Sequence, residues 1–396
     1  MRSAAAAIGA TILLAVATLL IYQHDGGWMY DAKVYRTAGN AVLRGLDLYS
    51  PARGQHFTYT PFAAVLFAPL SVLPATPFAL LWTALSVACL GGAVWLSLAW
   101  IGVPSGRRRF LLTAAICLLS CAGFEPVSFT LLLGQVNLIL MFVVLYDLWL
   151  PDQNRWKGLG IGVAAGIKLI PAFFIVYLLV TRRLRAAAVA TVAGAATIGL
   201  GFIAAPASSL EYWGGVFLQS GRVGDPQNVR SQSLQSLLVR WLHTNQGVLP
   251  LWLALSVAIA AAALLLAVIA HRRGDELLAI GVCGLATTLI APITWQHHWV
   301  WMLPVLLWLA ARARRDRSKV LWAVVAVVAV EFYVRPYMWG APVDPTTDLR
   351  LNLVQLLLAS TYAITAAALL VLAARHLIDP PPHVNAVDLN RRTAQH

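Results

Sequence analysis

Residues 251–270 read LWLALSVAIAAAALLLAVIA, an uncharged apolar run that His271, Arg272 and Arg273 follow directly. About 20 apolar residues are what an α-helix needs to cross the hydrocarbon core of a bilayer. Similar runs recur along the chain, of whose 396 residues 60% are hydrophobic and 11% charged. Water-soluble proteins of this length do not have such a composition. The sequence therefore predicts an all-α, polytopic membrane protein.

Short clusters of basic residues lie between the apolar runs and indicate their sidedness. The clearest ones occupy residues 107–109, 182–185 and 312–319. Because Lys and Arg are retained on the cytoplasmic side of membrane proteins, we place each cluster inside. This assignment gives about ten to twelve membrane segments with both termini cytoplasmic. It also explains the net charge of +13 without nucleic acid, since aromatic residues are not interleaved with the basic ones.

We expect residues 1–378 to form a single integral membrane domain. Its first segment, residues 1–21, has one Arg and a long apolar run but no convincing cleavage site, which favours a retained signal-anchor helix. Residues 379–396 are rich in Pro and polar residues and are predicted to form a disordered cytoplasmic tail. The 4 cysteines lie in apolar stretches, where they are expected to act as small core hydrophobes.

The apolar run at residues 158–180 carries basic residues at both ends, so a single crossing would place one cluster on the wrong side. We predict two short helices that enter and return, with a break at residues 166–171. Non-helical backbone at membrane depth is tolerated only where it lines a cavity. Lys168 lies at this break, and a lysine there calls for an anionic partner. The alternative for Lys168 is snorkelling to a headgroup.

Further candidates fall on the predicted outer side. Asp31 lies in a long polar and aromatic segment, predicted to be a loop, and is a candidate general base; the alternative is a solvated residue or a helix cap. His297 and His298 lie at an outer turn, and adjacent residues on a helix do not face the same way. Arg230 is a candidate phosphate anchor or a solvated loop charge. No metal is expected, because further ligands at helix spacing are absent near the His pair.

Taken together, several short motifs resemble the polyprenol-phosphate-mannose-dependent α-(1→2)-mannosyltransferases of actinobacterial cell envelopes. In chain order the resemblance rests on Asp31 and Tyr35; residues 57–62, including Tyr59; residues 134–137, including Gln135 and Asn137; residues 167–171 around Lys168; residues 231–234, including Gln232; and residues 295–301, with Trp295, His297 and His298. Each motif is short, and their order and spacing carry the likeness. Ser231 stands where the commoner form of its motif has Asn.

The resemblance implies a GT-C fold, in which a bundle of membrane helices carries extracytoplasmic loops that shape the active site. It implies inverting transfer of mannose from polyprenyl-phosphate-mannose to a hydroxyl of a phosphatidylinositol mannoside, at the periplasmic face of the cell membrane and without a cofactor. By the same likeness Asp31 is the base, Lys168 contacts the lipid phosphate, and His297 or His298 orients a substrate. The remaining motif residues are expected to bind substrate: Tyr35, Tyr59, Gln135, Asn137, Arg230, Gln232 and Trp295.

Two alternative functions stay open from the sequence. One is another lipid-linked glycosyltransferase of the same fold, such as an arabinofuranosyltransferase or the mannosyltransferase that branches lipoarabinomannan. The other is a flippase or transporter for a lipid-linked sugar, which has no need of Asp31 as a base. A phosphate-cradling glycine loop is not found, which argues against an ATP-driven pump and a nucleotide-sugar enzyme, and no repeated half with matching broken helices supports a transporter.

Overall fold

The structure is a computed structural model that describes residues 14, 17, 28–50, 57–339 and 351–378. Within these residues it is α-helical, and the only β pairing there is a bridge between Ser231 and Trp295. The all-α architecture predicted from composition is therefore confirmed. The predicted tail and, apart from residues 14 and 17, the predicted signal-anchor helix lie outside the described residues.

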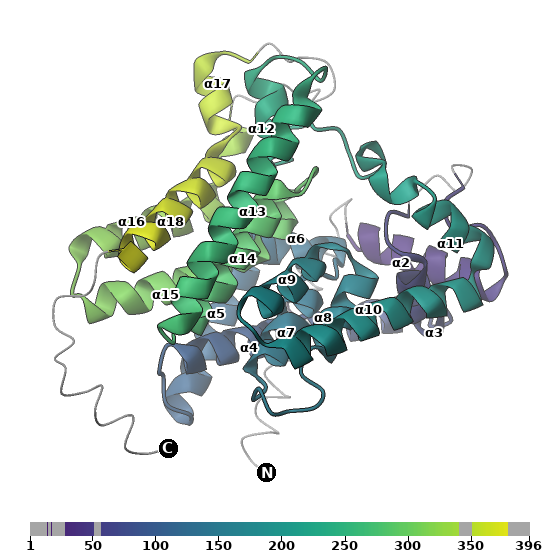
Figure 1. Ribbon diagram of the computed structural model, residues 1–396, viewed down its shortest axis with the longest axis horizontal. Helices are drawn as coiled ribbons and strands as arrows, with labels where there is room; N and C mark the ends of the chain where they lie inside the picture. Colours follow the sequence, from purple (N-terminus) through teal and green to yellow (C-terminus); the bar gives the residue numbers. More distant parts are fainter. Residues whose placement is uncertain (1–13, 15–16, 18–27, 51–56, 340–350, 379–396) are drawn as a thin grey trace.

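The first half of the described chain contains α2 (Tyr30–Leu43), α3 (Pro61–Ser71), α4 (Ala75–Trp100), α5 (Arg107–Gly123), α6 (Glu125–Leu133), α7 (Asn137–Trp149), α8 (Leu159–Ile167), η2 (Ile170–Ala172), α9 (Phe173–Val180) and α10 (Leu184–Ala204). The second half contains α11 (Pro206–Trp213), η3 (Val216–Leu218), η4 (Ser220–Arg222), α12 (Leu234–Trp241), α13 (Val248–Arg272), α14 (Glu276–Ile290), η5 (Gln296–Trp301), α15 (Met302–Arg315), α16 (Lys319–Val334), η6 (Pro336–Met338), α17 (Leu353–Leu358) and α18 (Thr361–Ile378). In Figure 1, α2, α3 and α11 lie at one end, α15, α16 and α18 at the other, and α6 to α9 and α14 between them.

Four helices of the described chain are long and apolar enough to cross a membrane: α4, α10, α13 and α18. A fifth candidate span is the pair α5 and α6, which is bent by 71°. Shorter apolar helices include α3, α7 and α14. The protein is thus a multi-pass membrane protein, while the number of ten to twelve segments stays a prediction.

Within the segment predicted to be a long outer loop, residues 30–43 form α2, so that prediction is wrong for these residues. Its buried face consists mostly of small residues, among them Ala32, Ala38 and Gly39. This face packs against α3, and a Cβ on Gly39 would lie 2.7 Å from the backbone of Phe67. Because α2 carries charged and polar side chains among its apolar ones, it lacks the long apolar run on which the membrane-helix predictions rest.

The predicted break between residues 166 and 171 is present. Helix α8 ends at Ile167, Lys168 has extended backbone angles, and η2 and α9 continue the chain. Gly158, Gly162 and Gly166 recur every fourth residue and bring α8 close to α10, because a Cβ on Gly162 would lie 2.3 Å from the carbonyl oxygen of Ala190. This close approach of two helices through small residues is typical of membrane bundles.

Candidate active site

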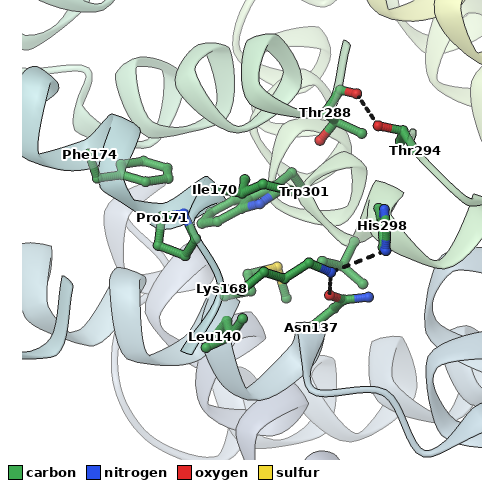
Figure 2. Close-up of a pocket in the computed structure, with 12 residues that line it drawn as sticks. Asn137, Leu140, Lys168, Ile170, Pro171, Phe174, Thr288, Thr294, His298 and Trp301 are labelled. Atoms are coloured by element: carbon green, nitrogen blue, oxygen red, sulfur yellow. Dashed lines mark hydrogen bonds between the residues drawn. The ribbon is translucent and has the colours of Figure 1, made fainter. Parts of the chain in front are cut away.

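Lys168 is held at the break between α8 and η2 by side chains from two other elements. Its Nζ lies 3.1 Å from Oδ1 of Asn137, at the start of α7, and 3.1 Å from Nε2 of His298 in η5. Figure 2 shows the Lys168 side chain pointing toward both groups. The ammonium also lies 5.5 Å from the ring centroid of Tyr59. The contacts leave Lys168 partly exposed, so a ligand can reach it.

The two histidines have different roles in this arrangement. The backbone carbonyl of His297 accepts hydrogen bonds from Asn137 Nδ2 at 3.0 Å and Thr130 Oγ1 at 3.2 Å, which fixes η5 against α6 and α7. The two imidazole rings are perpendicular, at 87°. Only the His298 ring contacts Lys168; the His297 ring nitrogens have no hydrogen-bond partner among the described residues. His298 is therefore the histidine that faces the lysine.

Both imidazoles are neutral in this environment. Burial lowers the pKa of His297 to about 3, and the charge of Lys168 acts in the same direction. The pKa of His298 is lowered by burial, by Lys168 and by its neighbour His297. Because the Lys168 ammonium donates to Nε2 of His298, the ring proton sits on Nδ1. Nδ1 is buried and has no hydrogen-bond partner among the described residues.

Asp31 lies in the first turn of α2, where Gln135 hydrogen-bonds to its carboxylate. The other end of the same amide is occupied: Oε1 of Gln135 accepts from the hydroxyls of Tyr35 at 2.8 Å and Tyr59 at 2.9 Å. The two hydroxyls are themselves 2.8 Å apart. This buried network fixes the orientation of Gln135, whose amide nitrogen is left to donate to Asp31.

The environment of Asp31, which lies outside the membrane-spanning helices, makes its carboxylate a stronger base than a free one. Burial raises its pKa from 3.8 to about 6, while the hydrogen bond from Gln135 and the charge of Lys168 oppose the rise. A group with a pKa near 6 is deprotonated at neutral pH and still accepts a proton readily. Asp31 and Lys168 are both partly exposed, and the charge of Lys168 acts on Asp31, so a proton acceptor lies within electrostatic reach of a cation.

The backbone around Gln135 explains why α6 and α7 are separate helices. Gly134 ends α6 in the left-handed conformation, with φ 67°. A Cβ there would lie 2.6 Å from Cβ of Ala32, so the absent side chain also lets α2 approach. Trp82 Nε1 donates to the Gly134 carbonyl at 2.8 Å. This turn places Gln135 beside Asp31.

A small cavity of about 40 Å³ opens beside Lys168. Its wall is mostly apolar and includes Leu140, Pro171, Phe174 and Trp301 (Figure 2). This volume holds a few water molecules and is too small for a sugar ring. The cation therefore lies at the boundary between an apolar wall and the partly exposed polar surface that carries Asp31.

Comparisons with known proteins agree with this arrangement. The model of glycosyltransferase family 87 matches residues 57–292. The chain belongs to glycosyltransferase family 87. A polyprenol-phosphate-mannose-dependent alpha-(1-2)-phosphatidylinositol pentamannoside mannosyltransferase of Mycobacterium tuberculosis (strain CDC 1551 / Oshkosh) is 37% identical over 298 residues, covering 72% of this chain and 67% of the relative. A polyprenol-phosphate-mannose-dependent alpha-(1-2)-phosphatidylinositol mannoside mannosyltransferase of Mycolicibacterium smegmatis is 33% identical over 329 residues, which cover 75% of this chain and 73% of the relative. No solved structure matches the chain.

The family 87 match includes Tyr59, Gln135, Asn137 and Lys168 but ends before His298 and begins after Asp31. In the structure, Asp31 and the η5 histidines nevertheless interact with residues inside the match: Gln135 and Lys168 act on Asp31, and the histidines contact Asn137 and Lys168. As a member of the family, the protein is a glycosyltransferase of the membrane.

The remaining candidates make contacts elsewhere. Arg230 is exposed and acts by its charge on Glu125, which the hydroxyls of Tyr337 and Tyr362 also contact. Nε2 of Gln232 donates to the carbonyls of Val229 and Ala359, and Nε1 of Trp295 donates to the carbonyl of Val223. These hydrogen bonds connect the 223–232 segment to η5 and to the start of α18. The proposed substrate contacts of Arg230, Gln232 and Trp295 stay predictions.

One residue that stabilises the site was not singled out from the sequence. Thr60 lies in the 57–62 motif, where its side chain caps α3 by accepting from the amide of Ala63. Its hydroxyl also donates to the carbonyl of Gly166, two residues before Lys168. A Thr that precedes Pro61 at the start of an apolar helix is a cap signal that sequence analysis offers.

Proposed function

We propose that the protein transfers mannose from polyprenyl-phosphate-mannose to a hydroxyl of a phosphatidylinositol mannoside, on the periplasmic side of the membrane. The observation that supports the proposal is that Asp31, with its raised pKa, and the Lys168 ammonium are both partly exposed and lie close enough for their charges to interact. The names of the family 87 relatives specify this donor and this class of acceptor.

In this reaction Asp31 removes the proton from the acceptor hydroxyl. The hydroxyl oxygen then attacks the anomeric carbon of mannose from the face opposite the phosphate, and the bond from that carbon to the phosphate oxygen breaks. The products are the new glycoside with inverted configuration, polyprenyl phosphate, and a proton on the Asp31 carboxyl. Holding the two reactants in line removes most of the entropic cost of their encounter.

Lys168 and His298 stabilise the leaving group. Negative charge develops on the phosphate oxygen as the bond breaks, and a preorganised cation in a partly dehydrated site stabilises that charge. Nε2 of His298 lies 3.1 Å from the Lys168 ammonium and orients it toward the phosphate. Asn137 holds Lys168 in place at 3.1 Å.

The apolar wall beside Lys168 suits the first isoprene units of the donor. Leu140, Pro171, Phe174 and Trp301 line the cavity next to the ammonium. A phosphate bound at Lys168 would place its hydrocarbon chain along this wall and out toward the bilayer. The sugar on the other side of the phosphate would face Asp31.

Radiolabelled transfer by purified protein tests the proposal. The assay supplies polyprenyl-phosphate-mannose and a phosphatidylinositol mannoside, with wild type beside Asp31→Asn. Loss of the base lowers the transfer rate by a factor of about 1,000. Asp152→Asn is the matched control, because Asp152 is exposed and pairs with Lys157 away from the site; it is expected to transfer at the wild-type rate.

Other outcomes separate the alternatives. Equal transfer by wild type and Asp31→Asn would show that the base is another group. Wild-type transfer from an arabinose donor alone would identify an arabinosyltransferase. Movement of the lipid-linked sugar across a vesicle membrane, unchanged in Asp31→Asn and without transfer, would identify a transporter.

A further inference from the structure

The solvent-facing side of α2 carries a row of basic and polar side chains. Lys33, Arg36, Thr37, Asn40 and Arg44 follow one another at spacings of three, one, three and four residues, which places them along one helix face. Together with Leu46 and Ser71 they line a groove of about 560 Å³. The opposite face of α2 packs against α3.

The charge of this groove is not neutralised within the described chain. None of the residues that line it is acidic. Among the described residues, no carboxylate forms an ion pair with Lys33, Arg36 or Arg44. The Nε atom of Arg36 is buried and has no hydrogen-bond partner there. Three cations without a counter-ion favour an anionic ligand.

The groove lies at the level of the lipid headgroups. The depth of the groove is judged from α4, a candidate membrane span that begins at Ala75. Arg36 donates to the carbonyl of Leu73 at 2.6 Å, and its guanidinium lies 5.2 Å from the ring centroid of Phe78, in the first turn of α4. Since the first turn of a span lies at the membrane surface, Arg36 lies among the phosphate groups of the bilayer.

We propose that this groove binds the phosphodiester of the acceptor lipid. The inference rests on the proposed function, in which the reacting complex contains two phosphate groups. Lys168 accounts for the donor phosphate at the reacting centre. The acceptor phosphodiester is separated from the reacting hydroxyl by inositol and mannose units, so it needs a second site that is some distance away.

The length of α2 gives that distance. Asp31 lies at the start of the helix, and the groove extends from Lys33 to Arg44 on the same helix. With a rise of 1.5 Å per residue, the groove covers about 3 to 20 Å from Asp31 along the helix axis. One rigid helix thus sets the spacing between the base and the phosphate site, and it thereby favours acceptors with a matching number of sugars.

Lipid binding without a donor tests this site independently of transfer. The probe is a phosphatidylinositol mannoside, titrated into purified protein in neutral detergent, with phosphatidylglycerol as the comparison lipid. The test variant is Lys33→Gln with Arg44→Gln, which leaves the anchored Arg36 intact. The matched control is Arg107→Gln with Arg108→Gln, which removes the same charge from two exposed residues at the start of α5.

The test variant is expected to bind the glycolipid about tenfold more weakly, because it loses two of the three basic residues that attract the lipid phosphate. The control pair is expected to bind it like wild type, and phosphatidylglycerol binding is expected to be the same in all three proteins. In the transfer assay, the KM for the acceptor is expected to rise in the test variant, while kcat and the KM for the donor are expected to stay unchanged.

Two results would overturn the assignment. Unchanged glycolipid affinity in the test variant would show that the groove does not bind the acceptor. A parallel loss of phosphatidylglycerol affinity would show a general site for anionic lipid. A wild-type protein that binds the glycolipid through Lys33 and Arg44 and transfers no sugar would contradict the proposed function and leave this lipid site standing.

Discussion

The Asp31 carboxylate sets the acid side of the pH profile. Burial raises its pKa to about 6, so the base is protonated and inactive below that pH. We expect kcat/KM to fall about tenfold per pH unit below pH 6 and to level off above it. An exposed Asp, with a pKa of about 3.9, would keep the enzyme active to pH 4 or 5. Initial rates from pH 4.5 to 8 decide between the two.

Removing the hydrogen bond from Gln135 is expected to shift the pH dependence of kcat/KM. It lowers the pKa of Asp31, so Gln135→Leu is expected to move the acid limb to higher pH while transfer persists at pH 8. Gln219→Leu is the control, because Gln219 is exposed in the segment between η3 and η4. An acid limb that stays in place in Gln135→Leu would show that Asp31 is not the group that titrates.

At the scale of elements, the close packing of α8 on α10 fixes Lys168. A Cβ on Gly162 would lie 2.3 Å from the Ala190 carbonyl and 2.6 Å from the Cβ of Ala193. Neither helix backbone yields easily, so Gly162→Ala is expected to separate them and to lower the free energy of unfolding by about 1–3 kcal/mol. Because Lys168 follows α8 directly, the transfer rate of the folded variant is expected to fall as well.

Gly199 in α10 is the matched control for this prediction. A Cβ there meets no atom within 4 Å. Gly199→Ala is therefore expected to stabilise the helix by about 0.5–1 kcal/mol and to leave the transfer rate unchanged. Thermal unfolding of both variants in detergent measures the difference. Equal stability of Gly162→Ala and wild type would show that the two helices are not in the tight contact described.

The elements show what the sequence can predict and what it cannot. The break at Lys168 is predictable because charges flank an apolar run at both ends. Helix α2 is not, since charged and polar residues are spread among its apolar ones and it contains no long apolar run. The contact of Gln135 with Tyr35 and Tyr59 joins residues 100 and 76 positions apart. Such contacts depend on how α2 and the turn after α6 approach each other, and no local pattern encodes that approach.

At the scale of the whole molecule, the sequence also does not show which of its motifs lie close together in the folded protein. Motifs around Asp31, Gln135 and Lys168 come close together, because Gln135 and Lys168 both act on the Asp31 carboxylate. The motif with Arg230 and Gln232 instead positions a neighbouring segment. The backbone amide of Gln232 donates to the Thr294 carbonyl at 2.7 Å, just before η5. A motif that positions a neighbouring segment and a motif that contacts substrate are alike in a sequence.

The sidedness of the molecule follows from where its basic clusters lie, and it yields a prediction for the whole chain. The cluster at residues 107–109 is expected inside, and the segment before α13 is expected outside, with Asp31. Single cysteines at Ser105 and Asn245, both exposed, report the two faces. The 4 native cysteines are buried, so their background labelling is low.

A membrane-impermeant maleimide applied to intact cells is expected to label Asn245→Cys at once and Ser105→Cys only after permeabilisation. The physical reason is the retention of Arg107, Arg108 and Arg109 on the cytoplasmic side. The reverse pattern would place Asp31 and Lys168 in the cytoplasm. There the proposed donor would have to present its sugar to the opposite leaflet, and the periplasmic assignment would be wrong even if transfer itself were measured.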